Sequence, residues 1–237
     1  MFRKLRIKLF GGEEEEELLE TGFPEETGEE PDGEGERLSE LETMRTRLVL
    51  SQISPHFLFN SLNAIYFLCE KDTKAAQTAI TELSSYLRGN MDSVNASEPI
   101  PFETELQHIE HYLAIEKLRY GDELEIQYDI NVRDFSVPAL SVQALVENAV
   151  HHGIGKTENG GKISISSWPG YDTILVEVAD NGVGFDPEEV AKDKTRSHTG
   201  IANTRSLLRA LCGATLEIVS ERGRGTRAMI RLPKSEI

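Results

Sequence analysis

Apolar residues in the first half of the chain recur at spacings of three and four positions, which predicts long amphipathic helices. The first predicted helix begins near Arg37 and runs past Cys69, and Pro55 should bend it. A second helix follows the Asp72-Thr73 pair, which suits a helix cap. Because only a tight turn separates the two helices, we expect a helical hairpin.

The first of these helices carries apolar side chains over too much of its surface for one partner helix to cover. We therefore expect the hairpin, residues 37–97, to pair with a second copy of itself in a four-helix bundle, which makes the protein a homodimer. A long connection near Asn90–Ile100 should act as a hinge to the second half.

The second half, residues 98–237, alternates between helical and strand patterns. Helices are predicted over Phe102–Arg119, Pro138–His152 and Gly200–Cys212. Strands are predicted over Leu124–Ile130, Lys162–Trp168, Ile174–Ala179, Thr215–Ser220 and Arg227–Leu232, with a glycine-rich, charged loop that ends at about Thr199. This order fits neither a simple βαβ alternation nor an all-β protein. It predicts an α+β fold in which helices cover one face of a mixed sheet.

Composition separates residues 1–36 from the rest of the chain. They hold 13 acidic and 4 basic residues, whereas residues 37–237 hold 28 and 21. From Gly11 to Glu36, 21 of 26 residues are Glu, Asp, Gly or Pro, so too little apolar surface is available to offset the ordering entropy, and we expect a disordered tether. Residues 1–10 alternate basic and apolar side chains, which predicts either a weak contact with an anionic membrane surface or a frayed start without a role.

Net charge and cysteine content limit the functional classes. The formal net charge of −16 argues against a direct nucleic-acid partner, because phosphate binding needs a basic face. No apolar run reaches the roughly 18 residues of a membrane-spanning helix, and the start lacks the apolar stretch of a signal peptide. The two cysteines, Cys69 and Cys212, suit a reducing compartment. We therefore expect a cytoplasmic protein that could lie at the inner face of the membrane through residues 1–10.

A polar stripe marks the first helix. At about 100° per residue, one arc of this otherwise apolar helix holds four polar residues, Gln52, His56, Asn60 and Asn63. A neutral imidazole can act as a nitrogen nucleophile near pH 7, and an asparagine one turn later can hydrogen-bond it or an incoming phosphoryl group. A satisfied polar layer inside a helical bundle would show the same pattern.

The helix predicted before Gly153 presents Glu147 and Asn148 shortly before its end. The amide oxygen of Asn148 suits Mg²⁺, which keeps most of its waters and takes one or two protein oxygens beside phosphates. His151 and His152 follow, and protonated histidines are favourable near the negative end of a helix. An ordinary polar helix end would look similar.

The segment Asp180-Asn-Gly182-Val-Gly184 comes directly after a predicted strand. A carboxylate accepts hydrogen bonds but cannot donate them, so Asp180 would select the exocyclic amine of adenine over the keto oxygen of guanine. The two glycines would let the backbone approach the ring closely. A plain Asp-Gly turn is the alternative.

Two further segments could contact phosphate or nucleotide. Gly200 opens a helix that includes Asn203, and the free backbone amides at such an end suit phosphate oxygens. Gly225 and Thr226 end a glycine-containing segment between the last two strands, which taken alone predicts no more than a hairpin loop with positive φ.

The order of these motifs is more informative than any one of them. A helix asparagine, Asp-x-Gly-x-Gly, a helix led by Gly200 and Gly-x-Gly-Thr before the last strand resemble the ATP-binding pattern shared by gyrase, Hsp90, histidine kinases and MutL. With Pro55-His56-Phe-Leu-Phe-Asn60 upstream, residues 45–233 resemble sensor histidine kinases of the LytS/YehU type. The resemblance includes Leu87-Arg88, Val146-Glu-Asn-Ala149 and Tyr112-Leu113-x-Ile115-Glu116-x-x-Arg119. It implies a GHKL (Bergerat-type) α/β sandwich over residues 98–237.

In that family, the motif histidine receives the γ-phosphoryl group of ATP and passes it to an aspartate of a response regulator. The resemblance therefore implies that His56 is the phosphoacceptor, that Asn148 binds Mg²⁺ and that Asp180 selects adenine. The residues it places at ATP are Asn148, His151, His152, Asp180, Gly182, Gly184, Lys194, Gly200, Asn203, Gly225 and Thr226. The implied partners are a second copy of the chain and a response regulator with a receiver domain, for which a LytTR-type DNA-binding output is one option.

Some positions depart from the family pattern. Related sequences usually carry Lys where His151 stands, which predicts a weaker or pH-dependent phosphate contact. His198 stands where glycine is common, and it either stiffens the lid hinge or is a harmless lid residue. The lid cations Lys192, Lys194 and Arg196 could neutralise phosphate charge or remain solvated.

The general base is left open by the sequence. Phe57 follows His56 at a position where many other histidine kinases place Glu or Asp. Glu147 is the candidate, although it could instead be a structural partner of a nearby arginine. We therefore place His56, Asn60 and Glu147 in the predicted catalytic set.

Three domains are predicted: residues 1–36 as start and tether, 37–97 as dimerisation and phosphotransfer helices, and 98–237 as the ATP-binding domain. Such kinases normally carry membrane-spanning sensor segments, so the acidic tether leaves the input signal unexplained. A nucleotide-binding pseudokinase scaffold is one alternative, favoured by His151 and His198. A serine kinase of the anti-sigma-factor type is another, although it has no reason to keep the Pro55–Asn60 motif.

Overall fold

The computed structural model describes residues 54–94, 96, 98–157, 159–186 and 199–234. Several predictions for other residues lie outside these ranges: the tether, the membrane contact of residues 1–10, the helix over residues 37–53, Gln52, and the lid residues Lys192, Lys194, Arg196 and His198. Within the described ranges, no helix combines the length and the apolar character needed to cross a membrane.

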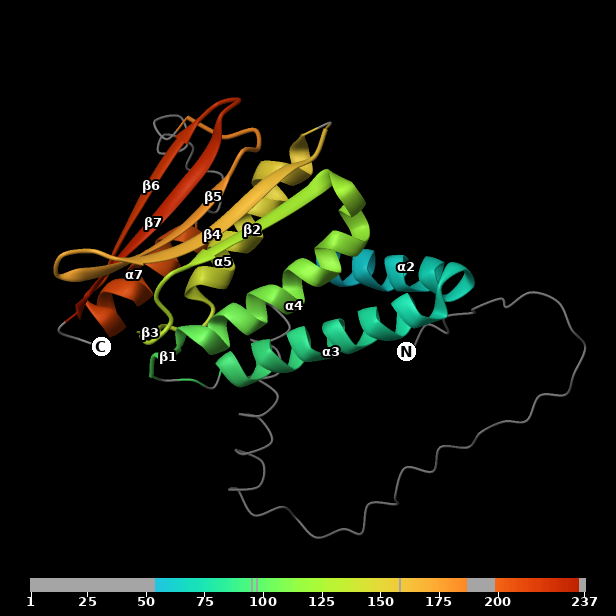
Figure 1. Ribbon diagram of the computed structural model, residues 1–237, viewed down its shortest axis with the longest axis horizontal. Helices are drawn as coiled ribbons and strands as arrows, with labels where there is room; N and C mark the ends of the chain where they lie inside the picture. The colour runs from blue at the N-terminus through green and yellow to red at the C-terminus, as the bar shows by residue number, and fades with distance from the viewer. Residues whose placement is uncertain (1–53, 95, 97, 158, 187–198, 235–237) are drawn as a thin grey trace, which may run out of the picture. The chain divides into compact units, whose positions relative to one another are not determined.

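The predicted helical hairpin is formed by α2 (Pro55–Lys71) and α3 (Thr73–Val94), with Asp72 between them (Figure 1). The Asp72 carboxylate accepts the backbone N–H of Ala75 at 2.9 Å, so it caps α3 as predicted. Ser54 has φ −59° and ψ 118°, so α2 begins at Pro55 rather than bending there. This position suits proline, because the first turn of a helix needs no N–H donor from it.

The helix α4 (Phe102–Tyr120) follows and packs along α3 (Figure 1). The predicted connection from Asn90 to Ile100 is too long, because α3 continues to Val94. Asn90 is buried in α3, and its Oδ1 accepts a hydrogen bond from Gln143 at 2.9 Å. The short strands β1 (Ile100–Pro101) and β3 (Ser136–Val137), which the sequence did not predict, pair antiparallel beside the start of α4.

Five strands form the main sheet in the order β2-β4-β5-β7-β6. They are β2 (Leu124–Ile130), β4 (Gly161–Pro169), β5 (Thr173–Asp180), β6 (Thr215–Glu221) and β7 (Gly225–Pro233). β2 pairs with β4 in parallel, and the other neighbours pair antiparallel. The side chains of β5 alternate between half-buried and buried positions, as expected for a sheet with one covered face. The predicted mixed sheet is thus confirmed.

Helices α5 (Ser141–Asn148) and α7 (Thr199–Cys212) cover this sheet (Figure 1). Their apolar side chains, including Val146 and Leu208, share one core with those of the strands. The α-helix predicted over Pro138–His152 is wrong at both ends. Leu140 has a left-handed φ of 62°, so α5 starts at Ser141, and after Asn148 the chain continues as a π-helical turn over Ala149–Gly153. The α+β fold itself is confirmed.

Candidate functional site

The first turn of α5 is fixed by a carboxylate from another helix. Glu105 in α4 is fully buried, and it accepts the backbone N–H groups of Leu140, Val142 and Gln143 at 2.9, 3.0 and 3.0 Å. These donors have no partners within the helix, and the positive end of the helix dipole favours a carboxylate there. Burial raises the pKa of Glu105 to about 7, although the three N–H donors act in the opposite direction. Glu105 thereby orients α5 on α4.

Two residues before the π-helical turn, Glu147 is held by two hydrogen bonds. Its Oε1 accepts from Gln143 Nε2 at 2.8 Å and from the Tyr86 hydroxyl at 3.1 Å. Burial raises the pKa of Glu147, and both donors oppose this effect. In the described part of the chain, its hydrogen-bond partners come from α5 and α3, and none is an arginine.

The side-chain amide of Asn148 has one defined orientation. Its Nδ2 donates to the carbonyl of Ala144 at 2.7 Å, one turn earlier in α5. Among the described residues, nothing donates to its Oδ1, which leaves this oxygen available as a ligand. A neutral amide oxygen is a ligand type that Mg²⁺ accepts beside phosphates, so the geometry fits the predicted metal role.

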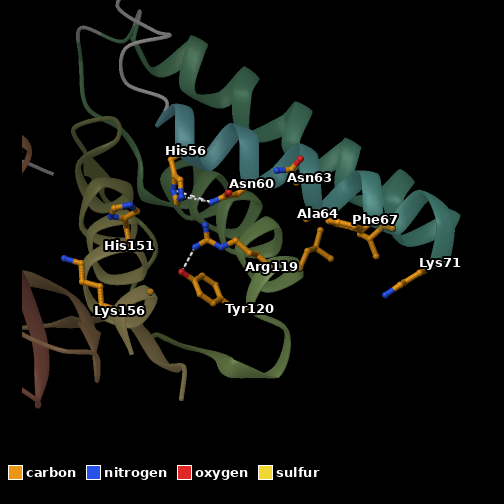
Figure 2. Close-up of a pocket in the computed structure, with 13 residues that line it drawn as sticks. His56, Asn60, Asn63, Ala64, Phe67, Lys71, Arg119, Tyr120, His151 and Lys156 are labelled. Carbon is orange, nitrogen blue, oxygen red and sulfur yellow. Dashed lines mark hydrogen bonds between the residues drawn. The ribbon is translucent and has the colours of Figure 1, made fainter. Parts of the chain in front are cut away.

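His56 from the first half of the chain lies beside His151 from the second half. The two ring centroids are 5.9 Å apart with the rings nearly perpendicular, and His151 in turn contacts His152 with a centroid separation of 4.6 Å. The side-chain amide nitrogen of Asn60 lies 3.3 and 3.2 Å from the two ring nitrogens of His56 (Figure 2). The predicted histidine and asparagine therefore contact each other one turn apart.

Two cavities meet at His56, and His151 and Arg119 line both of them. The larger cavity, of about 820 Å³, extends along α2 to Lys71, and Tyr120 and Lys156 also line it (Figure 2). The smaller cavity, of about 230 Å³, is lined by Ser54, His56, Phe57, Tyr86, Tyr112, Glu116, Arg119, Glu147, Asn148, His151 and His152. The smaller cavity thus brings together the predicted phosphoacceptor, general base and metal ligand.

The predicted adenine end is built around Asp180 at the end of β5. This side chain is 9% exposed, its Oδ1 accepts the N–H of Gly182 at 2.8 Å, and burial raises its pKa. Gly225 has φ +88°, and a Cβ there would lie 1.9 Å from the carbonyl oxygen of Asp180. A Cβ on Gly182 would lie 2.2 Å from the carbonyl carbon of Gly153. Only glycine fits at these two positions, which explains part of the sequence motif.

The other residues predicted to contact nucleotide differ in burial and in how closely the surrounding atoms approach them. Gly184 has φ +57°, and a Cβ there would lie 2.0 Å from the carbonyl oxygen of Glu221. Thr226 is half-buried in β7, and its hydroxyl lies 3.0 Å from that of Ser220. Gly200 and Asn203 are exposed in the first turns of α7, and a Cβ on Gly200 would meet nothing within 4 Å.

The sequence reasoning missed two residues of this region. Glu105 lies on the apolar face of α4 between Phe102 and Leu106, and an acidic residue at such a position is itself a signal of a buried partner. Arg119 entered only as part of a family motif, although its spacing of three residues from Glu116 predicts an ion pair on one helix face. Neither signal could have shown which elements lie opposite.

Two family models match this chain. The model described as "Histidine kinase" matches residues 44–124. The model described as "Histidine kinase-, DNA gyrase B-, and HSP90-like ATPase" matches residues 139–236. The first match includes α2, with His56, and the second includes Asn148, Asp180 and the glycines around it. Both parts of the sequence resemblance are thereby confirmed.

Several curated proteins are similar over most of this chain. The uncharacterised protein YwpD of Bacillus subtilis (strain 168) is 37% identical over 81% of this chain and 71% of its own length. Sensor histidine kinase YpdA of Escherichia coli (strain K12) is 36% identical over 73% of this chain, and sensor protein LytS of Bacillus subtilis (strain 168) is 31% identical over 86%. The matched region makes up 31% of YpdA and 36% of LytS, so this chain spans about a third of the length of these two proteins. With its helical hairpin, mixed sheet and both family matches, the chain belongs to the histidine kinases, and its sequence is similar to that of LytS.

Proposed function

We propose that this chain is an ATP-dependent kinase that phosphorylates itself on His56 and then passes the phosphoryl group to an aspartate of a response regulator. The observation that carries the proposal is the position of His56, whose ring lies 5.9 Å from that of His151 in the ATPase part of the chain. The proposal keeps residues 37–97 as the phosphotransfer part and residues 98–237 as the nucleotide-binding part.

The chemistry is an in-line phosphoryl transfer. One ring nitrogen of His56 donates its electron pair to the γ-phosphorus, the bond from that phosphorus to the β–γ bridging oxygen breaks, and ADP leaves with the electron pair. The proton on the other ring nitrogen then leaves to a base or to water. In the second step, a carboxylate oxygen of the regulator attacks the phosphorus, the P–N bond breaks with its electron pair going to the ring nitrogen, and the ring takes a proton back from the base or from water, which restores the neutral imidazole. Attack needs an approach of about 3–3.5 Å, which the amide of Asn60 supports by orienting the ring.

Glu147 is the proposed base. It lines the smaller cavity together with His56, and its raised pKa makes the carboxylate a better proton acceptor near neutral pH. Its Oε1 is held by Tyr86 and Gln143, whereas nothing in the described part of the chain donates to its Oε2. The second oxygen is the one that would take the proton.

In this proposal, the phosphates of the nucleotide lie near the smaller cavity, which Glu147 and Asn148 both line. Asn148 would hold Mg²⁺ through its Oδ1, and the ion would neutralise phosphate charge. Asp180 would accept the adenine amine, and His151 and His152 would face the phosphates. The remaining predicted contacts, Gly182, Gly184, Gly200, Asn203, Gly225, Thr226 and the lid residue Lys194, keep their proposed roles.

A second copy of the chain is the proposed partner of the hairpin. Four large apolar side chains of α2 are exposed, namely Phe59 (68%), Leu62 (49%), Tyr66 (65%) and Phe67 (62%). An uncovered apolar face of this size favours helix pairing. A regulator with a receiver domain is the proposed phosphoryl acceptor, with a LytTR-type output as its finer form, and residues 1–10 would add at most a weak contact with an anionic membrane surface.

Incubation with γ-labelled Mg-ATP tests the proposal. Wild type should take up label that is labile in acid and stable in alkali, and His56→Gln should take up none. His111→Gln is the matched control, because His111 lies in α4 and pairs with Glu82 at 2.6 Å, and it should be labelled as wild type is. Label on serine would favour the serine-kinase alternative, and nucleotide binding without label would favour the pseudokinase.

A further inference from the structure

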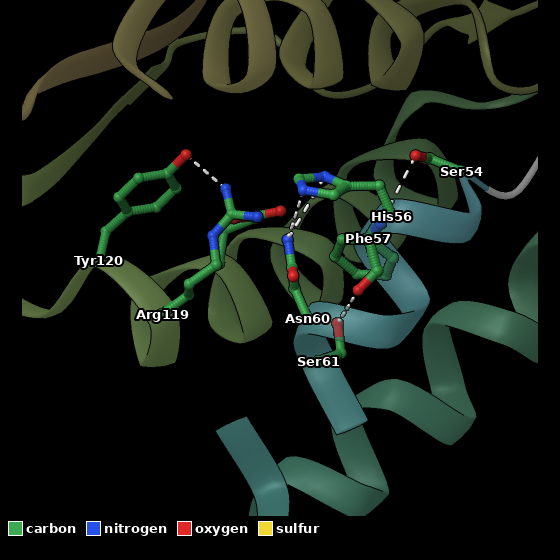
Figure 3. A network of polar contacts seen from close by, with 8 residues as sticks. Ser54, His56, Phe57, Asn60, Ser61, Arg119 and Tyr120 are labelled. Carbon is green, nitrogen blue, oxygen red and sulfur yellow. Dashed lines mark hydrogen bonds and ion pairs between the residues drawn. The ribbon is translucent and has the colours of Figure 1, made fainter. Parts of the chain in front are cut away.

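Arg119 lies beside the phosphoacceptor, although nothing in the proposed function uses it. It is in the last turn of α4, its side chain is 24% exposed, and it lines both cavities with His56 and His151. Figure 3 shows the guanidinium between Tyr120 and the pair formed by His56 and Asn60. Its position therefore needs an explanation in terms of what occupies these cavities.

The guanidinium is held on one side and free on the other. Its Nη2 lies 2.8 Å from Oε2 of the buried Glu116 and also contacts the Tyr120 hydroxyl, while the Cζ atom lies 4.2 Å from the centre of the Tyr120 ring. Among the described residues, Glu116 Oε2 accepts no hydrogen bond of good geometry, so its contact with Arg119 is an ion pair only. In the described part of the chain, the N–H groups on Nε and Nη1 have no acceptor. Arg119 is thus oriented but retains donors for a ligand.

The surrounding charges favour an anion. The described residues that line the larger cavity include Lys71, Arg119, Lys156 and two histidines but no carboxylate, although the whole chain carries a net charge of −16. Burial lowers the pKa of His151, and the nearby His56, Lys156 and Arg119 lower it further. Such mutual repulsion is relieved when an anion enters the space between these groups.

We propose that Arg119 binds the phosphoryl group that His56 receives, with Lys156 as a second cation on the opposite wall. A guanidinium donates two parallel hydrogen bonds to phosphate oxygens, and the donors left by Glu116 and Tyr120 allow this. The inference rests on the proposed function, because it takes His56 as the phosphoacceptor. The bound chemistry is a tetrahedral phosphoryl group, which is first the γ-phosphate of ATP and then the phosphate on His56.

Removing Arg119 alone would leave the Glu116 carboxylate buried without its partner. The test therefore uses E116Q as the reference protein, because this variant has no carboxylate at position 116. E116Q/R119Q is compared with E116Q, and the two differ only in the guanidinium. We expect phosphorylation of His56 to be roughly 10- to 100-fold slower in the double variant, because a hydrogen bond to a charged group is lost in the transition state. Arg119→Lys should retain part of the rate. Affinity for ADP should stay within about twofold, because ADP lacks the γ-phosphate.

Two measurements distinguish binding of the γ-phosphate of ATP from binding of the phosphate on His56. The initial labelling rate reports on the γ-phosphate, and the half-life of the label after removal of ATP reports on phosphorylated His56. Lys156→Gln should slow labelling by a smaller factor than the loss of Arg119. Arg133→Gln is the matched control, because Arg133 forms an exposed ion pair with Glu103 at 2.6 Å, and it should leave both quantities unchanged. Equal rates and equal half-lives in E116Q and E116Q/R119Q would overturn the proposal, as would faster labelling of the double variant.

A failure of the proposed function can be distinguished from a failure of this site. If wild type takes up no label, the function has failed, and titration with inorganic phosphate then judges the site. Imidazole NMR signals of His56 and His151 should shift with phosphate in wild type and in E116Q, but not in E116Q/R119Q. Identical shifts in all three proteins, or none in wild type, would contradict an anion site at Arg119.

Discussion

The two ends of α5 are built in opposite ways. At Ser141, the helix starts on three N–H bonds to a fully buried carboxylate, which comes from α4. After Asn148, the helix widens into a π-helical turn whose two histidines are exposed, and one of them, His151, lies beside His56. π-Helical turns occur often at functional sites. One end therefore anchors the helix, and the other presents the side chains that would act on nucleotide.

This difference shows how one helix can both stabilise the fold and serve a reaction. Changes at the anchored end should lower the stability of the whole protein, because they leave buried donors without acceptors. Changes at the open end should alter nucleotide binding and leave stability almost unchanged. Each prediction below tests this separation.

Glu105→Ala should have the largest effect. The substitution leaves three backbone N–H groups at the start of α5 without an acceptor. Because these groups lie in the protein interior, the free energy of unfolding should fall by about 3–5 kcal/mol. Urea denaturation measures this. Glu103→Gln is the control two residues earlier, because Glu103 forms an exposed ion pair with Arg133 and should change the value by less than about 1 kcal/mol. If the two variants were equally stable, the anchor would be refuted.

Asp180→Asn tests the end of α5 that continues into the π-helical turn, at the point where this turn meets the end of β5. A Cβ on Gly153 would lie 2.5 Å from Asp180 Oδ1, so Asp180 lies directly against the end of the π-helical turn. Asparagine keeps an acceptor for the Gly182 N–H but loses the charge, and we expect ADP affinity to fall by roughly 10- to 100-fold. Calorimetric titration of wild type and variant with ADP and GDP measures this. A wild type that prefers GDP would contradict the role of Asp180.

His151 should give the smallest effect, visible as a pH dependence. Its pKa in the free protein is lowered by burial and by His56, Lys156 and Arg119, and bound phosphates would raise it. Binding then takes up a proton, so affinity for a non-hydrolysable ATP analogue should increase several-fold as the pH falls from about 8 to about 6. His151→Lys should remove this part of the pH dependence. Parallel pH profiles for the two proteins would show that His151 does not face the phosphates.

Local rules in the sequence predicted much of the fold. The helix α4 and the five strands of the main sheet followed from periodicity, and the predicted boundaries lie within a few residues of the observed ones. Gly182 and Gly225 could be singled out because glycine answers a backbone requirement that is local to a turn. The same holds for the cap at Asp72.

Contacts between distant segments were beyond these rules. The start of α5 was placed too early because its anchor, Glu105, belongs to another helix, and the left-handed Leu140 gives no periodic signal. The spacing of Glu116 and Arg119 predicts their ion pair, but only the packing of α2 on α4 brings Arg119 to His56. Tertiary packing thus decided the parts of the site that sequence patterns left open.

The central claim is that the imidazole of His56 takes the terminal phosphate of ATP. Phosphorus NMR of the protein after incubation with Mg-ATP tests it most directly, because phosphohistidine and phosphoserine give different resonances. The account predicts one phosphohistidine resonance in wild type and none in His56→Gln. A phosphoserine resonance, or a phosphohistidine resonance that persists in His56→Gln, would contradict it.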